Sequence, residues 1–130
     1  MKYKILIVMA KFYEDLSKNL IFGAKEKLKG KANIKIIEVP GSFEIPVVIS
    51  KNIKKYDGFV ALGSIIKGET PHFDFISQTI TETIMQLSVN SKKPIANGVI
   101  TTLNRKQAES RSLTKGQEAA VAVLSVLDNF

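Results

Sequence analysis

The 130-residue chain has no cysteine and no tryptophan, and it has a single histidine. Without thiols it can form no disulfide, thiolate metal site or cysteine nucleophile, and such a composition suits a cytoplasmic protein. One imidazole and scattered carboxylates match no pattern of metal ligands, so we expect no metal site. Any acid–base role for a histidine must fall to His72.

Long hydrophobic runs are also missing. No stretch approaches the roughly 20 apolar residues of a membrane span, so we expect no membrane partner. The start, Met1–Ala10, is basic and then apolar like a secretion signal, but it turns polar without a convincing cleavage site and predicts a first core strand. Glycine fingerprints for phosphate, repeats and linkers are absent too, so one domain over residues 1–130 is expected.

Arginine is scarce, since 17 of the 19 basic residues are lysine. The net charge of +7 comes from residues 1–55, which hold 12 basic and 5 acidic side chains, whereas residues 56–130 hold 7 of each. Such an excess can attract nucleic acid or anionic substrates. Because the lysines are scattered and not grouped with aromatic residues, a lysine-coated surface is the simpler interpretation, and we expect no nucleic-acid partner.

The chain does contain a regular alternation of two patterns. Short, nearly continuous apolar runs are typical of buried strands in a parallel sheet, and four are present: Tyr3–Met9, Ile34–Val39, Gly58–Leu62 and Ile95–Ile100. Apolar residues at helical spacing lie between and after them. They predict helices over 16–28 (ended by Gly30), 43–53 and 75–87, and two separate C-terminal helices, Gln107–Arg111 and Gly116–Leu127.

This alternation predicts a three-layer α/β/α domain with a four-stranded parallel sheet and right-handed crossovers. Parallel sheets carry their functional loops at the carboxyl ends of the strands. Four loops qualify, and they hold nearly all of the notable polar and aromatic residues: 10–15, 40–44, 63–72 and 101–104.

The segment Ala61–Ile76 is the most informative part of the sequence. Thr70 is a favourable N-cap and Pro71 a favourable first helical residue, so the turn Lys67–Thr70 is expected at a helix N-terminus, where amides and the dipole attract anions. His72 would follow in the first turn, and its titration near neutrality suits chemistry on a phosphorylated substrate. A solvated surface histidine and ordinary helix capping are the alternatives.

Three other loop residues have two interpretations each. Glu44, after a Pro-Gly turn, could accept hydrogen bonds from substrate hydroxyls or compensate a helix dipole. Phe12 could stack on a flat heterocycle or fold back into the core. Arg111 could bind phosphate through its forked guanidinium or simply end a short surface helix.

Three motifs, taken together and in order, resemble the lumazine synthase family: Pro40–Pro46, Ala61–Ile76, and Asn97–Thr102 followed by Gln107, Ala108 and Arg111. The resemblance runs from the first strand to the last helix and is compatible with a flavodoxin-like fold. It implies condensation of 5-amino-6-(D-ribitylamino)uracil with 3,4-dihydroxy-2-butanone 4-phosphate. The products are 6,7-dimethyl-8-ribityllumazine, phosphate and water, in the penultimate step of riboflavin biosynthesis, and the family uses no cofactor or metal.

The resemblance also implies roles for individual residues. His72 matches the proton-transfer residue, and Phe12 matches the ring that stacks on the pyrimidine. The remaining positions match contacts to the ribityl chain (Ser42, Phe43, Glu44), the uracil edge through the backbone (Ser64, Ile65, Ile66), the phosphate (Gly68, Glu69, Thr70), and contacts from across a subunit boundary (Asn97, and Arg111 on phosphate).

Some features depart from the family pattern. Lys67 stands where many members carry arginine, and a short segment after Arg111 leaves the role of Lys115 open. Family members form pentamers, and some form decamers or sixty-subunit shells, so the resemblance implies at least a homopentamer with active sites between subunits. A homologue that binds flavin-like ligands without turnover and a flavodoxin-like signalling domain are the alternatives. The second would want an acidic cluster after the first strand, where this chain has Ala10–Phe12.

Overall fold

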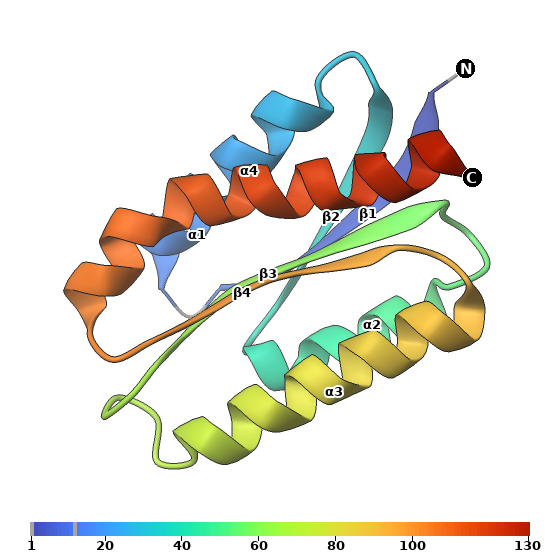
Figure 1. Ribbon diagram of the computed structural model, residues 1–130. Coiled ribbons are helices and arrows are strands. Elements are labelled where there is room, and N and C mark those ends of the chain that lie inside the picture. The colour runs from blue at the N-terminus through green and yellow to red at the C-terminus, as the bar shows by residue number, and fades with distance from the viewer. Residues whose placement is uncertain (1, 12) are drawn as a thin grey trace.

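The computed structural model describes residues 2–11 and 13–130. A four-stranded parallel sheet of order β2-β1-β3-β4 lies between two layers of helices (Figure 1). The strands are β1 (Tyr3–Ala10), β2 (Ala32–Val39), β3 (Gly58–Ile66) and β4 (Ile95–Thr102). The predicted three-layer, flavodoxin-like arrangement is confirmed.

Two helices cover each face of the sheet. Helices α1 (Glu14–Leu28) and α4 (Arg105–Asn129) lie on one face, and α2 (Ile45–Lys51) and α3 (Phe73–Ser91) lie on the other (Figure 1). Alternate residues of β1 therefore enter two different cores: Ile5 and Ile7 pack with α1 and α4, whereas Leu6 and Val8 pack with α2 and α3. A strand buried on both faces needs a continuous apolar run, which is what this segment has.

The edge strand β2 differs from that expectation. Its outer position leaves Ile34, Ile36 and Ile37 only half-buried, because no further strand pairs with it among the described residues. The prediction of strands buried on both faces therefore holds for the inner strands β1 and β3 and is too general for β2.

The C-terminal helix corrects the sequence-based prediction of two helices. Helix α4 is continuous over 25 residues, and the Asn104 side chain caps its start by accepting a hydrogen bond from the Gln107 N–H at 2.9 Å. Gly116, where the second predicted helix begins, lies inside α4 and is a contact residue, since a Cβ there would lie 2.1 Å from the carbonyl oxygen of Leu20. Gly23 on α1 has the reciprocal role, with its Cβ position 2.3 Å from the Leu113 carbonyl oxygen. The two glycines allow the backbones of α1 and α4 to touch.

The start of α3 also differs from the prediction. The helix begins at Phe73 with His72 at the N-cap, so Thr70 and Pro71 precede the helix and neither caps nor opens it. The reason is local, because Thr70 pairs with Lys67 and the Glu69 N–H donates to the Ile66 carbonyl at 3.2 Å, which closes a separate turn before the helix.

The apolar face of α3 agrees with the predicted one except at Phe75, and Ile76 and Leu87 pack against the core. Phe75 is 68% exposed, and Phe73 packs against the core in its place. Ile80 and Ile84 are buried as predicted. Successive side chains on a helix point about 100° apart. An error of one or two positions at the end of a predicted apolar stripe therefore assigns the wrong ring to the core.

Candidate active site

Five of the predicted site residues meet in one pocket. It has a volume of about 200 Å³ and lies at the carboxyl end of β3, against the 3₁₀ turn Ser42–Glu44 and the start of α3. Its lining consists of Tyr13, Gly41, Ser42, Phe43, Ser64, Ile65, Thr70 and Ile76. We call this the main pocket. The position agrees with the rule that parallel sheets place ligands at the carboxyl ends of their strands.

Ser64 gives this pocket an unpaired polar group. Its Oγ is buried and has no hydrogen-bond partner among the described residues. A buried hydroxyl without a partner costs about 1–3 kcal/mol. Such a group is therefore suited to a polar ligand that can complete the missing bond.

The turn Lys67–Thr70 forms the rim of the main pocket next to Thr70. Gly68 has φ +89°, in the left-handed region that favours glycine. The Lys67 N–H donates to the Thr102 carbonyl at 2.9 Å, which fixes the turn to the end of β4. The Glu69 amide is used within the turn, so only part of the expected row of amide donors remains for an anion.

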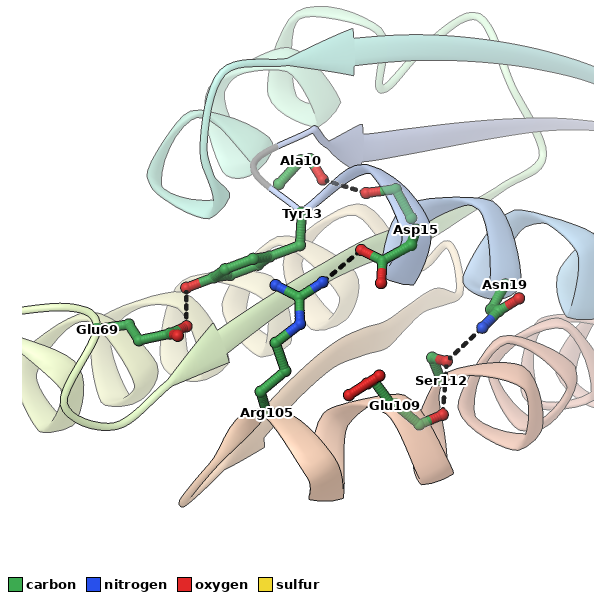
Figure 2. A network of polar contacts seen from close by, with 9 residues as sticks. Ala10, Tyr13, Asp15, Asn19, Glu69, Arg105, Glu109 and Ser112 are labelled. Atoms are coloured by element: carbon green, nitrogen blue, oxygen red, sulfur yellow. Dashed lines mark hydrogen bonds and ion pairs between the residues drawn. The ribbon is translucent and has the colours of Figure 1, made fainter.

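Tyr13 is a pocket residue that sequence reasoning missed. Its Oη donates to Glu69 Oε2 at 2.7 Å, and the Arg105 guanidinium carbon lies 5.2 Å from its ring centroid. Arg105 Nη2 also pairs with Asp15 Oδ1 at 2.5 Å (Figure 2). Burial, then the hydrogen bond to Glu69 and the charge of Glu69, raises the pKa of Tyr13 to about 12. The position next to Phe12 and the scarcity of arginine were the only sequence signals for this group.

Other predicted residues lie near the main pocket without lining it. His72 is exposed at the N-cap of α3, two residues after Thr70, and Glu44 is half-buried beside Phe43. The Ile66 side chain is buried in a small cluster with Leu16, so only its backbone is available to a ligand. The predicted stacking residue Phe12 lies outside the described residues.

The residues predicted to act across a subunit boundary lie elsewhere. Arg111 lines a second pocket of about 400 Å³ between β4 and α4, which shares no lining residue with the main pocket. Lys115 lies one helical turn along and lines the same space, so two cationic residues border this pocket. The other polar residues of its lining are Thr101, Thr102, Ser110, Thr114 and Glu118. We call this the α4 pocket. Its composition suits a phosphate group.

Asn97 lies in the middle of β4 and lines neither of these two pockets. It is half-buried, and its Oδ1 accepts a hydrogen bond from the Val99 N–H at 3.1 Å. The side chain is therefore held along its own strand, at the strand that forms the outer edge of the sheet beside α4.

Two further observations concern metal ligands and membrane-spanning helices. Across residues 2–11 and 13–130, no group of three or more histidine, aspartate or glutamate side chains could hold a metal ion. None of the helices in this part of the chain is long and apolar enough to cross a membrane. The described residues thus offer hydroxyls in the main pocket, an imidazole near it at the start of α3, and two cations in the separate α4 pocket.

Comparison with known proteins identifies the family. The family model for 6,7-dimethyl-8-ribityllumazine synthase matches residues 2–130. Relatives of that name are 41% identical in Leuconostoc mesenteroides (98% of this chain, 88% of the relative), 40% in Agrobacterium fabrum (98% and 94%) and 41% in Limosilactobacillus reuteri (96% and 86%). A solved flavone reductase covers 97% of this chain and 64% of its own at 14% identity, with a TM-score of only 0.45. On the family match and the relatives, the predicted membership is confirmed, and the chain belongs to the 6,7-dimethyl-8-ribityllumazine synthase family.

Proposed function

We propose that this chain condenses 5-amino-6-(D-ribitylamino)uracil with 3,4-dihydroxy-2-butanone 4-phosphate to give 6,7-dimethyl-8-ribityllumazine. The observation that carries the proposal is the family match over residues 2–130. The main pocket supports it, because two family motifs that are separate in the sequence supply Ser42, Phe43, Ser64, Ile65 and Thr70 to one site.

The reaction needs proton transfer and an acceptor for a leaving anion. The amine of the pyrimidine attacks the ketone, water leaves to form an imine, phosphate is eliminated, and ring closure releases a second water. Each step moves protons, and His72 at the start of α3 carries the one imidazole of the sequence, the side chain most often used for proton transfer in catalysis. The reacting carbons need no metal or redox group for these steps.

The pyrimidine is assigned to the main pocket. Phe43 and Ile65 offer apolar surface for a flat ring, and the Ser64 hydroxyl lacks a partner that a polar ring edge would supply. Glu44 ends the 3₁₀ turn beside Phe43, where its carboxylate can accept hydrogen bonds from ribityl hydroxyls. The ring would thus be held by packing and oriented by few polar contacts, as is usual for small-molecule sites.

The phosphate is assigned to the turn Lys67–Thr70 together with Arg111 and Lys115 of a neighbouring copy. Pockets for ligands of this size usually enclose about 300–1,000 Å³, and the main pocket offers only about 200 Å³. The missing cations lie in the α4 pocket, at the edge of the sheet. A closed ring of copies, a homopentamer or a multiple of it, would bring the α4 pocket of one copy against the main pocket of the next.

The purified chain should be mixed with both substrates while the absorbance of lumazine and the release of phosphate are followed together. The proposal predicts lumazine and phosphate in equal amounts, well above the uncatalysed background. Binding of the pyrimidine without product would instead support a non-catalytic ligand-binding protein. Light scattering on the same sample should show an assembly of five copies or a multiple, and a stable monomer would contradict the shared site.

A further inference from the structure

A chain of three contacts joins the loops that follow three different strands. Tyr13 precedes α1, Glu69 lies in the turn after β3, and Arg105 is the first residue of α4 after β4. The phenol donates to the carboxylate at 2.7 Å, the guanidinium lies over the phenol ring at 5.2 Å, and Asp15 pairs with the guanidinium (Figure 2). Nothing in the proposed reaction requires these contacts directly.

The position of Glu69 presents an electrostatic problem for the proposed function. Its carboxylate belongs to the same four-residue turn that is assigned to a phosphate dianion. Like charges within a few ångströms repel each other, and near a protein surface the repulsion is several times that in bulk water. A Glu69 side chain free to swing toward the phosphate would weaken its binding.

We propose that Tyr13, seated by Arg105, is a positioning residue that holds the Glu69 carboxylate away from the phosphate and fixes the turn Lys67–Thr70. This inference rests on the proposed function for the identity of the anion. It assigns the pair Tyr13 and Arg105 a role in the affinity for the phosphorylated substrate, with no part in bond making.

The surroundings of Tyr13 support that role. Its ring packs on a small buried cluster of Leu16, Ile66, Ile100 and Ala108. Tyr13 also lines the main pocket, so the cluster and the pocket wall together define its position. The raised pKa of about 12 keeps the phenol protonated, and therefore a hydrogen-bond donor, throughout the physiological range. Arg105 has three acidic neighbours, Asp15, Glu109 and Glu69, and the hydrogen bond to Asp15 and these charges raise the pKa of the guanidinium.

The test begins with Tyr13→Phe, which removes the hydroxyl and keeps the ring. We expect KM for the phosphorylated ketone to rise about three- to ten-fold, in line with the net contribution of one typical hydrogen bond. KM for the pyrimidine should rise less than KM for the ketone, although Tyr13 also lines the main pocket. Tyr3→Phe is the matched control, because Tyr3 Oη donates to Asp128 Oδ1 at the same 2.7 Å and neither residue lines the main pocket. The control should leave both KM values unchanged.

A double variant separates positioning from general damage. In a Glu69→Gln background no carboxylate remains to be held, so adding Tyr13→Phe should change KM for the ketone by less than about two-fold. An equal rise in KM in both backgrounds, or no rise in the single variant, would overturn the inference. KM for the phosphorylated ketone should rise less in Arg105→Lys than in Arg105→Gln, because lysine keeps the positive charge over the ring.

A second readout does not depend on turnover. Hydrogen exchange of the amides of residues 66–70 and 72 should be about three- to ten-fold faster in Tyr13→Phe than in the wild type, and unchanged in Tyr3→Phe. Faster exchange in a protein that forms no lumazine would mean that the proposed function fails while the positioning role stands. Unchanged exchange in a Tyr13→Phe protein that still forms lumazine would mean that the positioning role fails while the proposed function stands.

Discussion

Ser42 lies so close to Gly63 that a Cβ built on this glycine would stand 2.8 Å from the Ser42 Oγ and 3.2 Å from the Ala10 Cβ. The absence of a side chain at position 63 lets the 3₁₀ turn Ser42–Glu44 rest directly on β3. This contact sets the distance between two walls of the main pocket, the turn and the strand end. The geometry of the pocket therefore depends on a residue that does not line it.

Gly63→Ala should push the turn away from β3. We expect a loss of about 1–3 kcal/mol in the free energy of unfolding, as for other overpacked sites, measured by urea denaturation, and a clear rise in KM for the pyrimidine. Ser42→Gly added to Gly63→Ala removes the atom that the new methyl group meets and should recover most of the lost stability. No recovery in the double variant would show that the strain lies elsewhere.

Gly116→Ala should be among the most destabilising single-methyl additions in the chain. The new Cβ would meet the carbonyl oxygen of Leu20 at 2.1 Å, and a backbone atom cannot move aside as a side chain can. We expect a loss above about 3 kcal/mol despite the better helix propensity of alanine. Ser125→Ala, at an exposed position of the same helix, is the control and should change stability by less than about 0.5 kcal/mol. A thermal melt of Gly116→Ala close to that of the wild type would contradict the close contact of α1 and α4.

Ser64→Ala should separate stability from function. Since the Ser64 Oγ is buried without a partner among the described residues, its removal should leave the free energy of unfolding unchanged or raise it by about 1 kcal/mol. The same change should raise KM for the pyrimidine, because the ligand loses a hydrogen bond that it alone completes. A variant that is less stable and binds the pyrimidine as well as the wild type would refute both parts.

The burial of Tyr13, together with its hydrogen bond to Glu69, predicts a dependence of stability on alkaline pH. The pKa of Tyr13 rises from 10.0 to about 12 on folding, so the protonated phenol stabilises the folded state fully below pH 10 and loses that effect as the pH rises toward 12. The difference in free energy of unfolding between the wild type and Tyr13→Phe should therefore be largest below pH 10 and shrink between pH 10 and 12. Urea denaturation at several pH values measures it, and a constant difference would argue against a shifted tyrosine.

The layers and the sheet of this protein could be predicted from its sequence, because burial imposes regular patterns. Each of the four strands was recognised from its apolar run, and Gly30, with φ +78°, ends the region of α1 as expected. The errors arose where a residue has two uses. Gly116 was expected to begin a separate helix, and it lies inside α4 and serves a helix contact. Thr70 suggests a cap, and it pairs with Lys67.

The main pocket was predictable only in part. The family motifs indicated Ser42, Phe43, Ser64, Ile65 and Thr70, which do line it. Tyr13 and Arg105 were not found, because their partners Glu69 and Asp15 are 56 and 90 residues away in the chain and no local pattern marks such pairs. The division of the predicted residues between two pockets could not be seen in a sequence either, since it depends on where β4 and α4 lie relative to β3.

We propose above that the condensation takes place where the main pocket of one copy meets the α4 pocket of the next. His72→Ala and Arg111→Ala should be co-expressed in equal amounts and the mixed assemblies assayed for lumazine. Assembled alone, His72→Ala should turn over about 10²-fold more slowly, as for loss of a general acid–base group. Arg111→Ala assembled alone should bind the phosphorylated ketone poorly. In random mixtures about one quarter of the shared sites would hold both native residues, so we predict about one quarter of the wild-type activity. Mixed assemblies no more active than the two parents would contradict the shared site.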